Sequence, residues 1–466
     1  MLGMLVFAAP AAAQDPTGSC TAGATSGTKQ TFTCQLGPVV VAPYQVLTRE
    51  LLFNPPKPMV DGHITDMSVD LTDKDGTKVP ISRLMLHHIV FSKIGPRDPT
   101  CGNAFTGWDS RTPIPNLAER FYAAGEERAK MSLPPGYGYP TSKDDAWVLT
   151  YMVMNHRARV DRAYISYQVT VDTAPGLTPV TPYWLDVENC KADPVYDVPG
   201  GGARGATHRK SFVWTVPQGG RIVSGGGHVH GGGQNLTLRR PDCSDQRVYT
   251  SKPVWGGPRH PFYRVRPVLH EPGPIHMTGF RSPAGVPVAA GERVVLDSNY
   301  DAALPHTRVM GIFVLFMAHD RSVTERCGAH PNDFQQLPVP KGRRKPPPFT
   351  VPIVGLRNGK AVNIEKPPGR RASLGRRGTI SVGDMFFRRA NVSVKAGAKL
   401  TWRFGGPTLH NITLANGPRG FSSPNLNGGR TYSKRLGVPG TYQLFCGLHP
   451  VDMTGTVKVT RKRKRR

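Results

Sequence analysis

The sequence predicts an all-β protein built from about three folded units. Its 466 residues are too many for one hydrophobic core, because domains usually hold roughly 100 to 200 residues. Glycine (52) and proline (45) are both abundant, and apolar residues rarely recur at helical spacing. These observations favour short strands joined by turns.

The N-terminus is an apolar run that ends in Ala11, Ala12 and Ala13, the small-residue pattern of a signal-peptidase site. We therefore expect residues 1–13 to be a signal peptide and the protein to be exported, either secreted or periplasmic. The basic segment that usually begins a signal peptide is missing, which fits a truncated start; a plain apolar strand is the alternative. No long apolar run elsewhere in the sequence predicts a membrane span.

Seven cysteines also fit an oxidising compartment. Six of them form an even set, and neighbour order suggests three disulfides, although six cysteines allow many other pairings. The suggested pairs are Cys20 with Cys34, Cys101 with Cys190, and Cys243 with Cys327.

The formal net charge of +28 lies largely in residues 341–377 and in the tail, residues 461–466. Both segments are expected to be solvated and disordered. For an exported protein, the expected partners of such segments are anionic envelope polymers or lipid surfaces. No aromatic residues are interleaved with the basic ones, so no nucleic-acid partner is expected.

The chain divides into two β units, a linker and a third β unit. The first unit covers residues 14–204 and ends at the glycine-rich run 199–203, and the second covers residues 205–334. Residues 335–377, rich in Pro, Lys and Arg, predict an extended linker before the third unit at 378–460.

Within the first unit, residues 116–130 predict a helix, because Leu117, Phe121 and Ala124 recur at helical spacing. Strand-like runs fill much of the rest. These runs are 39–53, 81–92, 146–155 and 163–172 in the first unit, 212–216, 221–224, 236–239, 293–299 and 309–317 in the second, and 399–404 in the third.

Four candidate copper ligands lie in the third unit. Cys446, His449 and Met453 follow one another in one tight loop, and His410 lies upstream, after the strand predicted at 399–404. Two histidines and a cysteine in a plane, with a weak axial methionine, are the ligands of a blue-copper electron-transfer centre. A zinc site, or packing of a Cys/His pair without metal, is the alternative.

This segment resembles the plastocyanin and pseudoazurin group of cupredoxins. The resemblance covers residues 378–459, including the lead-in 440–446 and the final strand 453–459. It implies a Greek-key β-sandwich with one type 1 copper held by His410, Cys446, His449 and Met453.

Two histidine clusters stand out in the upstream units. His87 and His88 are adjacent in the apolar run 84–91, where neighbours on a strand normally point to opposite faces. His228 and His230 are two residues apart, so both fall on one face of an extended segment flanked by glycines. The second pattern favours chelation of a metal; a buried histidine pair without metal is the alternative.

Residues 39–319 resemble the copper type II, ascorbate-dependent monooxygenases, the group of peptidylglycine- and dopamine-hydroxylating enzymes. The resemblance rests on 87–89, 121–125, 133–139, 151–156, 228–230 and 310–317. It implies two jelly-roll β-sandwich domains with two type II coppers. One copper would be held by His87, His88 and His156, and the other, at the catalytic position, by His228, His230 and Met310.

The resemblance also implies hydroxylation of a C–H bond with dioxygen, one oxygen atom leaving as water. The blue-copper domain would then pass electrons to the copper pair, replacing or assisting a reductant such as an ascorbate-like molecule or a redox protein. A non-enzymatic copper-binding or electron-transfer protein that has lost hydroxylase activity is the alternative, so the assignment as an enzyme stays open.

Three residues of the family that bind the substrate carboxylate are missing. Their positions correspond here to Gly226, Ile312 and Val314. A peptidylglycine substrate is therefore not expected, and an apolar or uncharged substrate is our hypothesis. His306 lies close to Met310 and could compete as a ligand. The other histidines are expected at the surface or in packing: His63, His208, His260, His270, His276, His319 and His330.

Overall fold

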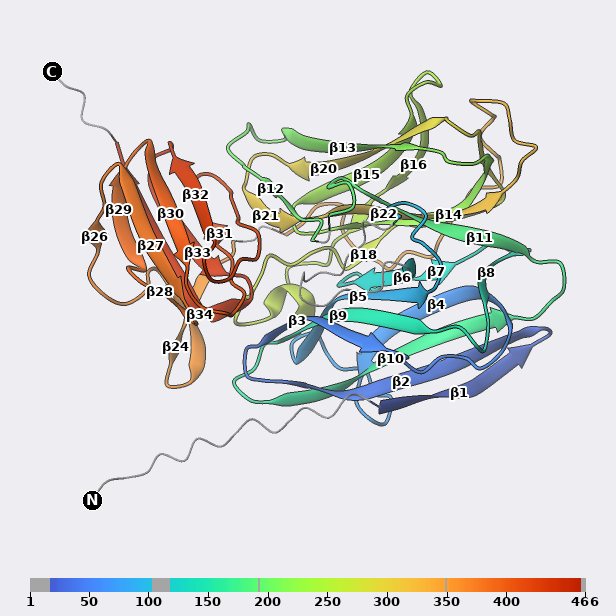
Figure 1. Ribbon diagram of the computed structural model, residues 1–466, viewed down its shortest axis with the longest axis horizontal. Coiled ribbons are helices and arrows are strands. Elements are labelled where there is room, and N and C mark those ends of the chain that lie inside the picture. The colour runs from blue at the N-terminus through green and yellow to red at the C-terminus, as the bar shows by residue number, and fades with distance from the viewer. Residues whose placement is uncertain (1–16, 103–117, 192, 348–349, 462–466) are drawn as a thin grey trace.

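The computed structural model describes residues 17–102, 118–191, 193–347 and 350–461. These residues form β-strands and one short 3-10 helix, η1 (Pro261–Arg264) (Figure 1). The all-β prediction is confirmed. None of the described helical segments is long and apolar enough to cross a membrane. The predicted signal peptide and residues 462–466 of the basic tail lie outside the described residues.

The first β-sandwich holds the candidate ligands His87, His88 and His156. Side chains such as Phe91, Phe121 and Trp147 form a common core. They come from strands that are buried along nearly their whole length. One layer has the order β3 (Val46–Phe53), β9 (Trp147–Asn155), β5 (Leu84–Ile94), β6 (Ala118–Gly125). The facing layer has the order β1 (Thr17–Ser26), β2 (Lys29–Val41), β10 (Asp161–Asp172), β4 (Gly62–Thr72), β8 (Tyr137–Thr141), with β7 (Met131–Ser132) beside β4.

The second β-sandwich has a separate core that includes Leu236, Phe280 and Phe313. One layer has the order β11 (Thr178–Asp186), β22 (Gly311–His319), β14 (Gly220–Val229), β19 (Gly279–Val288), β23 (Gln335–Gln336). The facing layer has the order β13 (Thr207–Thr215), β20 (Arg293–Asp301), β15 (Gly233–Arg240), β16 (Gln246–Ser251). Two small ribbons complete it: β12 (Tyr196–Val198) with β21 (His306–Val309), and β17 (Pro253–Val254) with β18 (His276–Met277).

A third β-sandwich at the C-terminus lies beside the ends of the other two (Figure 1). Its core contains Trp402, Phe404 and Tyr442. One layer has the order β26 (Ala372–Ser373), β29 (Asn391–Lys395), β34 (His449–Thr460), β33 (Gly440–Cys446), β31 (Thr413–Asn416). The other has the order β28 (Phe386–Phe387), β27 (Arg377–Gly383), β30 (Ala398–Phe404), β32 (Thr431–Leu436).

The predicted helix at 116–130 is wrong where the structure describes it, because residues 118–125 form strand β6, paired antiparallel with β5. Residues 116 and 117 lie outside the described residues. Phe121 and its neighbour Tyr122 are both buried, so both faces of this strand meet other side chains. A strand that is buried on both faces does not alternate apolar and polar residues along the sequence. Its apolar residues can then recur at the spacing of a helix.

The predicted boundary at residue 204 also differs from the way the cores divide the chain. Strand β11 precedes this boundary but pairs with β22 and places Tyr183 and Leu185 in the second core. Its start pairs in parallel with β8, so one sheet runs through both sandwiches. The glycine-rich run instead contacts the C-terminal sandwich, where the Pro199 carbonyl accepts a hydrogen bond from the Gly420 amide at 2.9 Å.

Part of the linker that was predicted to be disordered is a β-hairpin. Strands β24 (Ile353–Arg357) and β25 (Lys360–Ile364) pair through a turn at Asn358 and Gly359, both with positive φ. This dipeptide is typical of a tight hairpin turn. Ile353 and Val354 are buried, so the hairpin is anchored by apolar contacts.

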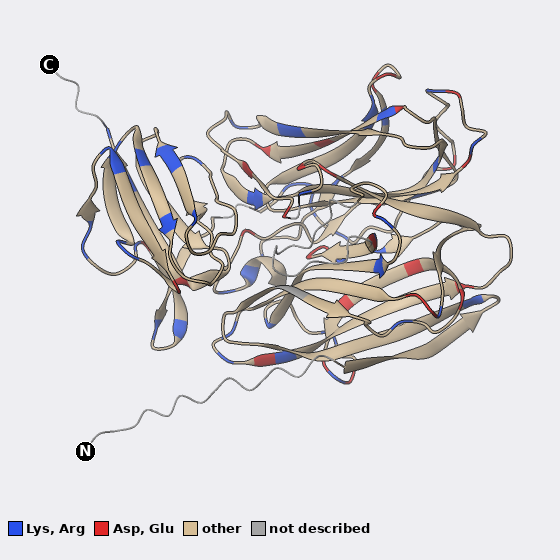
Figure 2. Ribbon diagram, in the orientation of Figure 1, with Lys and Arg blue, Asp and Glu red and all other residues tan. Residues whose placement is uncertain are grey.

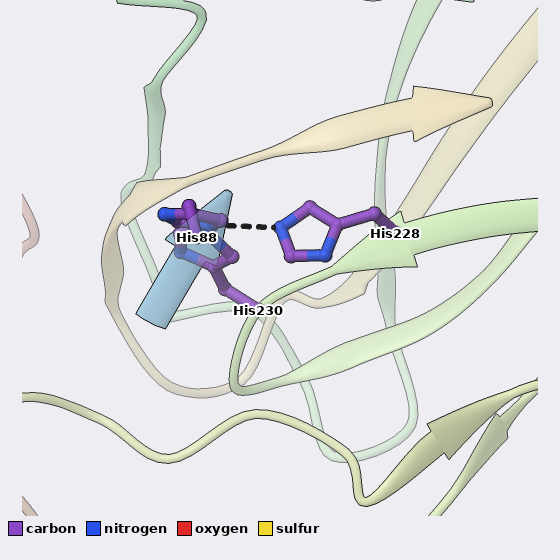
Figure 3. Close-up of side chains that lie close together, drawn as sticks. All are labelled: His88, His228 and His230. Carbon is purple, nitrogen blue, oxygen red and sulfur yellow. Dashed lines mark hydrogen bonds between the residues drawn. The ribbon is translucent and has the colours of Figure 1, made fainter. Parts of the chain in front are cut away.

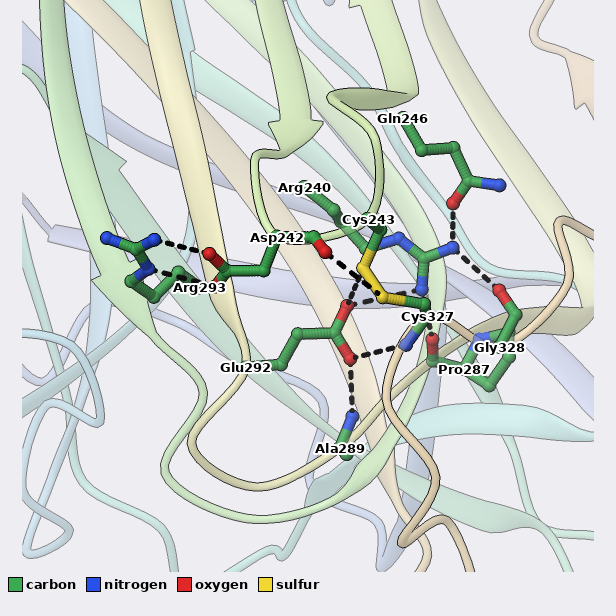
Figure 4. Close-up of a disulfide and its surroundings, with 10 residues drawn as sticks. All are labelled: Arg240, Asp242, Cys243, Gln246, Pro287, Ala289, Glu292, Arg293, Cys327 and Gly328. Carbon is green, nitrogen blue, oxygen red and sulfur yellow. Dashed lines mark hydrogen bonds and ion pairs between the residues drawn. A yellow bond between two sulfur atoms is a disulfide. The ribbon is translucent and has the colours of Figure 1, made fainter.

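The three suggested disulfides are present: Cys20–Cys34, Cys101–Cys190 and Cys243–Cys327. Beside the last of them, Arg240 and Glu292 form a fully buried ion pair at 3.2 Å (Figure 4). Arg240 also donates to the carbonyls of Pro287 and Gly328. Because its partners are supplied inside the protein, this charge pair can be buried.

Basic side chains form a row across the outer face of the C-terminal sandwich. Arg377, Lys399 and Arg435 are exposed and are register partners across β27, β30 and β32. Figure 2 shows blue basic segments on the strands of this sandwich. Like charges placed opposite one another on a sheet repel and destabilise it slightly. An anionic partner would relieve this repulsion.

Candidate metal centres

In the C-terminal sandwich, three of the four predicted copper ligands converge on one point. His410 Nδ1 lies 3.1 Å from His449 Nδ1, and Cys446 Sγ lies 3.9 Å and 3.7 Å from these two nitrogens. Ligands in a plane around an ion, at roughly 2.0 Å for nitrogen and 2.3 Å for sulfur, would be about 3.5 to 3.7 Å apart. The three side chains therefore fit a copper ion.

The sandwich holds these ligands on two adjoining segments. Cys446 ends β33 and pairs with His449 at the start of β34, while His410 precedes β31. The fourth predicted ligand, Met453, is fully buried in the same core. Asn411 connects the segments, because its amide donates to Cys446 Sγ at 3.4 Å and its side chain accepts from the Gly447 amide at 2.7 Å.

The pKa shifts in this site leave His449 neutral and ready to bind copper, whereas the Cys446 thiol must lose its proton first. Burial raises the pKa of the Cys446 thiol, so without a metal the sulfur is protonated. Burial, with a contribution from His410, lowers the pKa of His449 to about 4, which keeps this imidazole neutral at pH 7. Metal binding would therefore release the thiol proton.

In the central cluster, one histidine of the first sandwich meets two of the second. His88 Nε2 on β5 lies 3.1 Å from His228 Nε2 on β14 and 3.3 Å from His230 Nε2 just after β14 (Figure 3). These spacings suit three imidazoles around one metal ion. Gly125 permits the approach, since a Cβ there would lie 2.7 Å from the His228 ring.

Two further groups hold the His228 and His230 segments. Glu127 Oε2 lies 3.1 Å from His228 Nδ1, and this contact directs His228 Nε2 toward His88. Burial alone would lower the pKa of His228, but the Glu127 carboxylate outweighs it and raises this pKa. The Tyr300 hydroxyl accepts from the His230 amide at 2.8 Å and donates to the carbonyl of Met310 at 2.6 Å. Met310, between β21 and β22, is buried.

The structure groups the histidines differently from the family pattern. His87 Nδ1 faces His88 Nδ1 at 2.6 Å, whereas its Nε2 lies beside Glu126 and groups with His270. The pairing of β5 with β9 shifts between Leu86 and His88, so the regular alternation of side chains is interrupted there and the two neighbouring rings come into contact. His156, at the end of β9, is buried and interacts electrostatically with His270 and Glu126.

Three imidazoles of the central region, those of His87, His88 and His230, are neutral at pH 7 and so can bind a metal ion. Burial, then neighbouring histidines, lowers the pKa of His87 and of His88 well below the usual value. The same causes lower the pKa of His230 to about 3. Neutral imidazoles carry the free lone pair that a metal ion needs.

Sequence reasoning assigned His270 to packing and missed its place in the cluster. Its partner Glu126 is 144 residues away in the chain, so no local spacing marks the pair. His306, considered as a competing ligand, instead forms an ion pair with Glu271, with its Nδ1 2.8 Å from the carboxylate.

Comparisons with known proteins match two regions of the chain. Residues 377–460 match the family of copper binding proteins described as plastocyanin/azurin family. Amicyanin-alpha of Methylorubrum extorquens is 34% identical over 83 residues, which are 17% of this chain and 69% of that protein. Through its C-terminal sandwich, the chain belongs to the plastocyanin/azurin family. This sandwich is called the cupredoxin domain below, and its ligand set supports copper binding and electron transfer.

Solved structures similar to the cupredoxin domain include a purple cupredoxin from Nitrosopumilus maritimus. It is 25% identical and covers 18% of this chain and 99% of its own, with a TM-score of 0.17. A reduced Cu(I) form of an amicyanin mutant at pH 4 is 27% identical and covers 18% of this chain and 80% of its own, with the same TM-score.

Residues 177–320, which run from β11 to β22, match the family described as Stress up-regulated Nod 19. This match covers most of the second sandwich, including His228, His230 and Met310. The chain therefore combines a domain of this description with a C-terminal cupredoxin domain.

Two cavities meet at the central cluster. The first, of about 190 Å³, is lined by His87, His88 and His230 on one side, and by Asn411, Phe445 and Gly447 of the cupredoxin domain on the other. The second, of about 790 Å³, lies between the first two sandwiches and contacts His88 and His228. His88 and Met310 line both cavities.

Proposed function

We propose that the protein is an exported copper-dependent monooxygenase that hydroxylates a C–H bond of an apolar substrate and draws electrons through its own cupredoxin domain. The observation that carries this proposal is the smaller cavity. Its walls include His87 and His88 of the central cluster and both chain neighbours of Cys446, Phe445 and Gly447.

The proposed reaction consumes one C–H bond, one dioxygen, two electrons and two protons, and it yields an alcohol and water. Copper bound at the cluster would supply dioxygen activation and one-electron storage. The cupredoxin domain would pass on one electron at a time. Each transfer would leave the cupredoxin centre oxidised and the cluster reduced by one electron, so two transfers would supply the two electrons. An external ascorbate-like molecule or redox protein would then reduce the cupredoxin domain again.

Contacts between the cupredoxin domain and the second sandwich support the electron route. Asp197 accepts hydrogen bonds from the Ser422 amide at 2.6 Å and the Ser422 hydroxyl at 2.7 Å. Thr307 donates to the Leu414 carbonyl at 2.8 Å, and Arg308 donates to the Ser423 carbonyl at 3.2 Å. These contacts join the cupredoxin domain to the second sandwich beside the smaller cavity, which Thr307, Arg308 and Leu414 also line.

An apolar cluster adds the first sandwich and the linker hairpin to this interface. Its members come from the first sandwich, the loop after η1, strand β24 and strand β34. They are Tyr44, Val46, Met85, Met154, Leu269, Val354 and Val451. The hairpin therefore packs against the cupredoxin domain and the first sandwich within the segment for which an extended, disordered linker was expected.

The larger cavity supports an apolar substrate. Gly226, Ile312 and Val314, which replace the carboxylate-binding residues of the hydroxylase family, all line it. Met67 and Phe316 add further apolar surface. Its volume of about 790 Å³ suits a small organic molecule, since ligand sites usually measure roughly 300 to 1,000 Å³.

Stopped-flow reduction of the copper-loaded chain tests the electron route. After anaerobic reduction of the cupredoxin centre, its blue band should reappear while the Cu(II) EPR signal of the cluster disappears. Asp197→Ala should slow this exchange, whereas Asp320→Ala, which removes a surface partner of Arg221, should not. A blue band that never returns at the expense of the cluster would rule out intramolecular transfer.

The loss of the carboxylate-binding residues at Gly226, Ile312 and Val314 also favours a second function. In this alternative the protein carries electrons through copper and does not hydroxylate a substrate. Dioxygen uptake with a reductant and a set of apolar C–H compounds separates the two functions. The proposal expects uptake coupled to an alcohol product, and no product from peptidylglycine substrates. Uptake that never couples to any product would favour the electron carrier.

The basic row of Arg377, Lys399 and Arg435 supports a location at an anionic surface of the cell envelope. Exposed like charges at this spacing bind anionic polymers or headgroups through electrostatics that weaken with salt. We propose this attachment together with export.

A further inference from the structure

We infer that His87, Glu126 and His270 form a Cu(II) position of their own, with His156 as a fourth group at its edge. The inference deepens the proposed function, because it assigns ligands to one of the two central copper ions. It replaces the three-histidine set that the family pattern implies with a set that contains a carboxylate.

The three side chains place their ligand atoms around one oxygen. Glu126 Oε1 lies 3.4 Å from His87 Nε2 and in direct contact with His270 Nε2. The other carboxylate oxygen accepts a hydrogen bond from the Gly273 amide at 3.0 Å, which fixes the orientation of the carboxylate. The ring centroids of His87 and His270 are 4.9 Å apart.

The buried ring nitrogens of His156 are an independent indication that the group of His87, Glu126 and His270 lacks a ligand. It is 3% exposed, and among the described residues neither of its ring nitrogens makes a hydrogen bond of normal geometry. The backbone of Pro267 interacts with this imidazole but forms no hydrogen bond of normal geometry with it, and an incompletely satisfied buried imidazole costs free energy. Its electrostatic interactions with His270 and Glu126 place it beside the same position.

The ligand chemistry distinguishes this position from its neighbour. Two imidazoles and a carboxylate suit a divalent first-row ion, and the anionic oxygen favours Cu(II) over Cu(I). The neighbouring set of His88, His228 and His230 has no carboxylate among its metal-facing groups. Met310, a residue with a soft sulfur, lines the same two cavities as His88. Electrons would therefore pass downhill from the carboxylate position to the His88 position.

The location agrees with that direction. His87 and His270 both line the cavity shared with the cupredoxin domain, while His228 lines only the larger cavity. The carboxylate position therefore lies on the side from which electrons would enter. Without a metal, the same three groups would form an ordinary buried ion pair, and the experiment must separate these two cases.

Copper counting on the full chain makes this separation. Metal-free protein is titrated with Cu(II) and then analysed for bound copper and by EPR. Glu126→Gln and His270→Gln should each bind one copper ion fewer than the unmodified chain and lose one of the type II signals. The control His330→Gln replaces a partly buried histidine that lies 2.9 Å from the Val248 carbonyl and lines neither cavity, and it should bind as much copper as the unmodified chain.

Anomalous scattering at the copper edge, from crystals of the unmodified chain, removes the dependence on variants that fail to fold. A peak in contact with His87, Glu126 and His270 would support the assignment. A peak in contact with His87, His88 and His156, or unchanged copper counts in both variants, would overturn it. Turnover and the blue-band exchange report on the proposed function separately, so either can fail alone.

Discussion

The cupredoxin site and the central histidine cluster are built in opposite ways. In the cupredoxin domain, His410, Cys446, His449 and Met453 all belong to one sandwich and one core. In the cluster, His88 comes from the first sandwich and His228 from the second. A site within one core is fixed by local folding, whereas a site between two cores depends on how the cores meet.

The first prediction concerns a variant that removes the blue-copper site of the cupredoxin domain and leaves the central cluster intact. Cys446→Ser replaces the thiolate ligand and should abolish the blue absorption completely, because that absorption requires the copper–thiolate bond. The type II EPR signals of the cluster should remain. Absorption and EPR spectra of the copper-loaded variant check both expectations, and loss of the cluster signals as well would show that the two regions are not independent.

The second prediction concerns a variant that removes one ligand of the central histidine cluster. His88→Ala removes the imidazole that the first sandwich contributes to the set with His228 and His230, so copper affinity there should fall by about 100-fold or more. Competitive titration with a chelator measures this affinity. The blue band should be unchanged, and unchanged cluster affinity would contradict the assignment of His88.

A smaller effect is expected from the group that orients a ligand. Glu127→Gln weakens the contact with His228 Nδ1 and should lower copper affinity at the cluster by about 10- to 100-fold. Glu119→Gln is the matched control, since Glu119 is a partly buried carboxylate nearby in the chain that accepts from the Tyr139 hydroxyl at 2.6 Å. Equal losses in both variants would indicate a general effect on folding.

The smallest expected effect concerns stability and pH. Burial lowers the pKa of His306, but Glu271 outweighs it and raises the pKa above 6.5 in the folded protein. The ion pair therefore stabilises the fold fully below pH 6.5, and this contribution is lost as pH rises through the raised pKa. His306→Gln should cost about 1 to 2 kcal/mol at low pH and less at high pH.

Thermal unfolding of the metal-free chain on both sides of this window measures the difference. His208→Gln is the control with the opposite sign, because burial lowers the pKa of His208 and its replacement should help at low pH. A loss for His306→Gln that does not change with pH would exclude the ion pair as its cause.

The sequence predicted the cupredoxin ligands because three of them share a loop of a few residues and form a specific set. The all-β class followed from turn residues and the scarcity of helical spacing. The disulfides agreed with neighbour order. His228 and His230 were also accessible to sequence reasoning, since their spacing places them on one face of a strand.

What the sequence did not indicate depends on contacts across long stretches of chain. Glu126 and His270 meet only because a loop of the second sandwich folds over the end of β6 in the first. The helix predicted around Phe121 failed because the strand is buried on both faces. The hairpin at Asn358 and Gly359 had a local turn signal, which the surrounding basic residues obscured.

The adjacency of His87 and His88 has a consequence for how the central positions fill. Their Nδ1 atoms face one another at 2.6 Å, a contact with room for one proton between them. A neutral imidazole that binds metal through Nε2 must carry its proton on Nδ1, so two occupied positions would bring two N–H groups together. The rings would then have to separate. Filling either position should weaken the other, and this negative cooperativity must be equal in both directions.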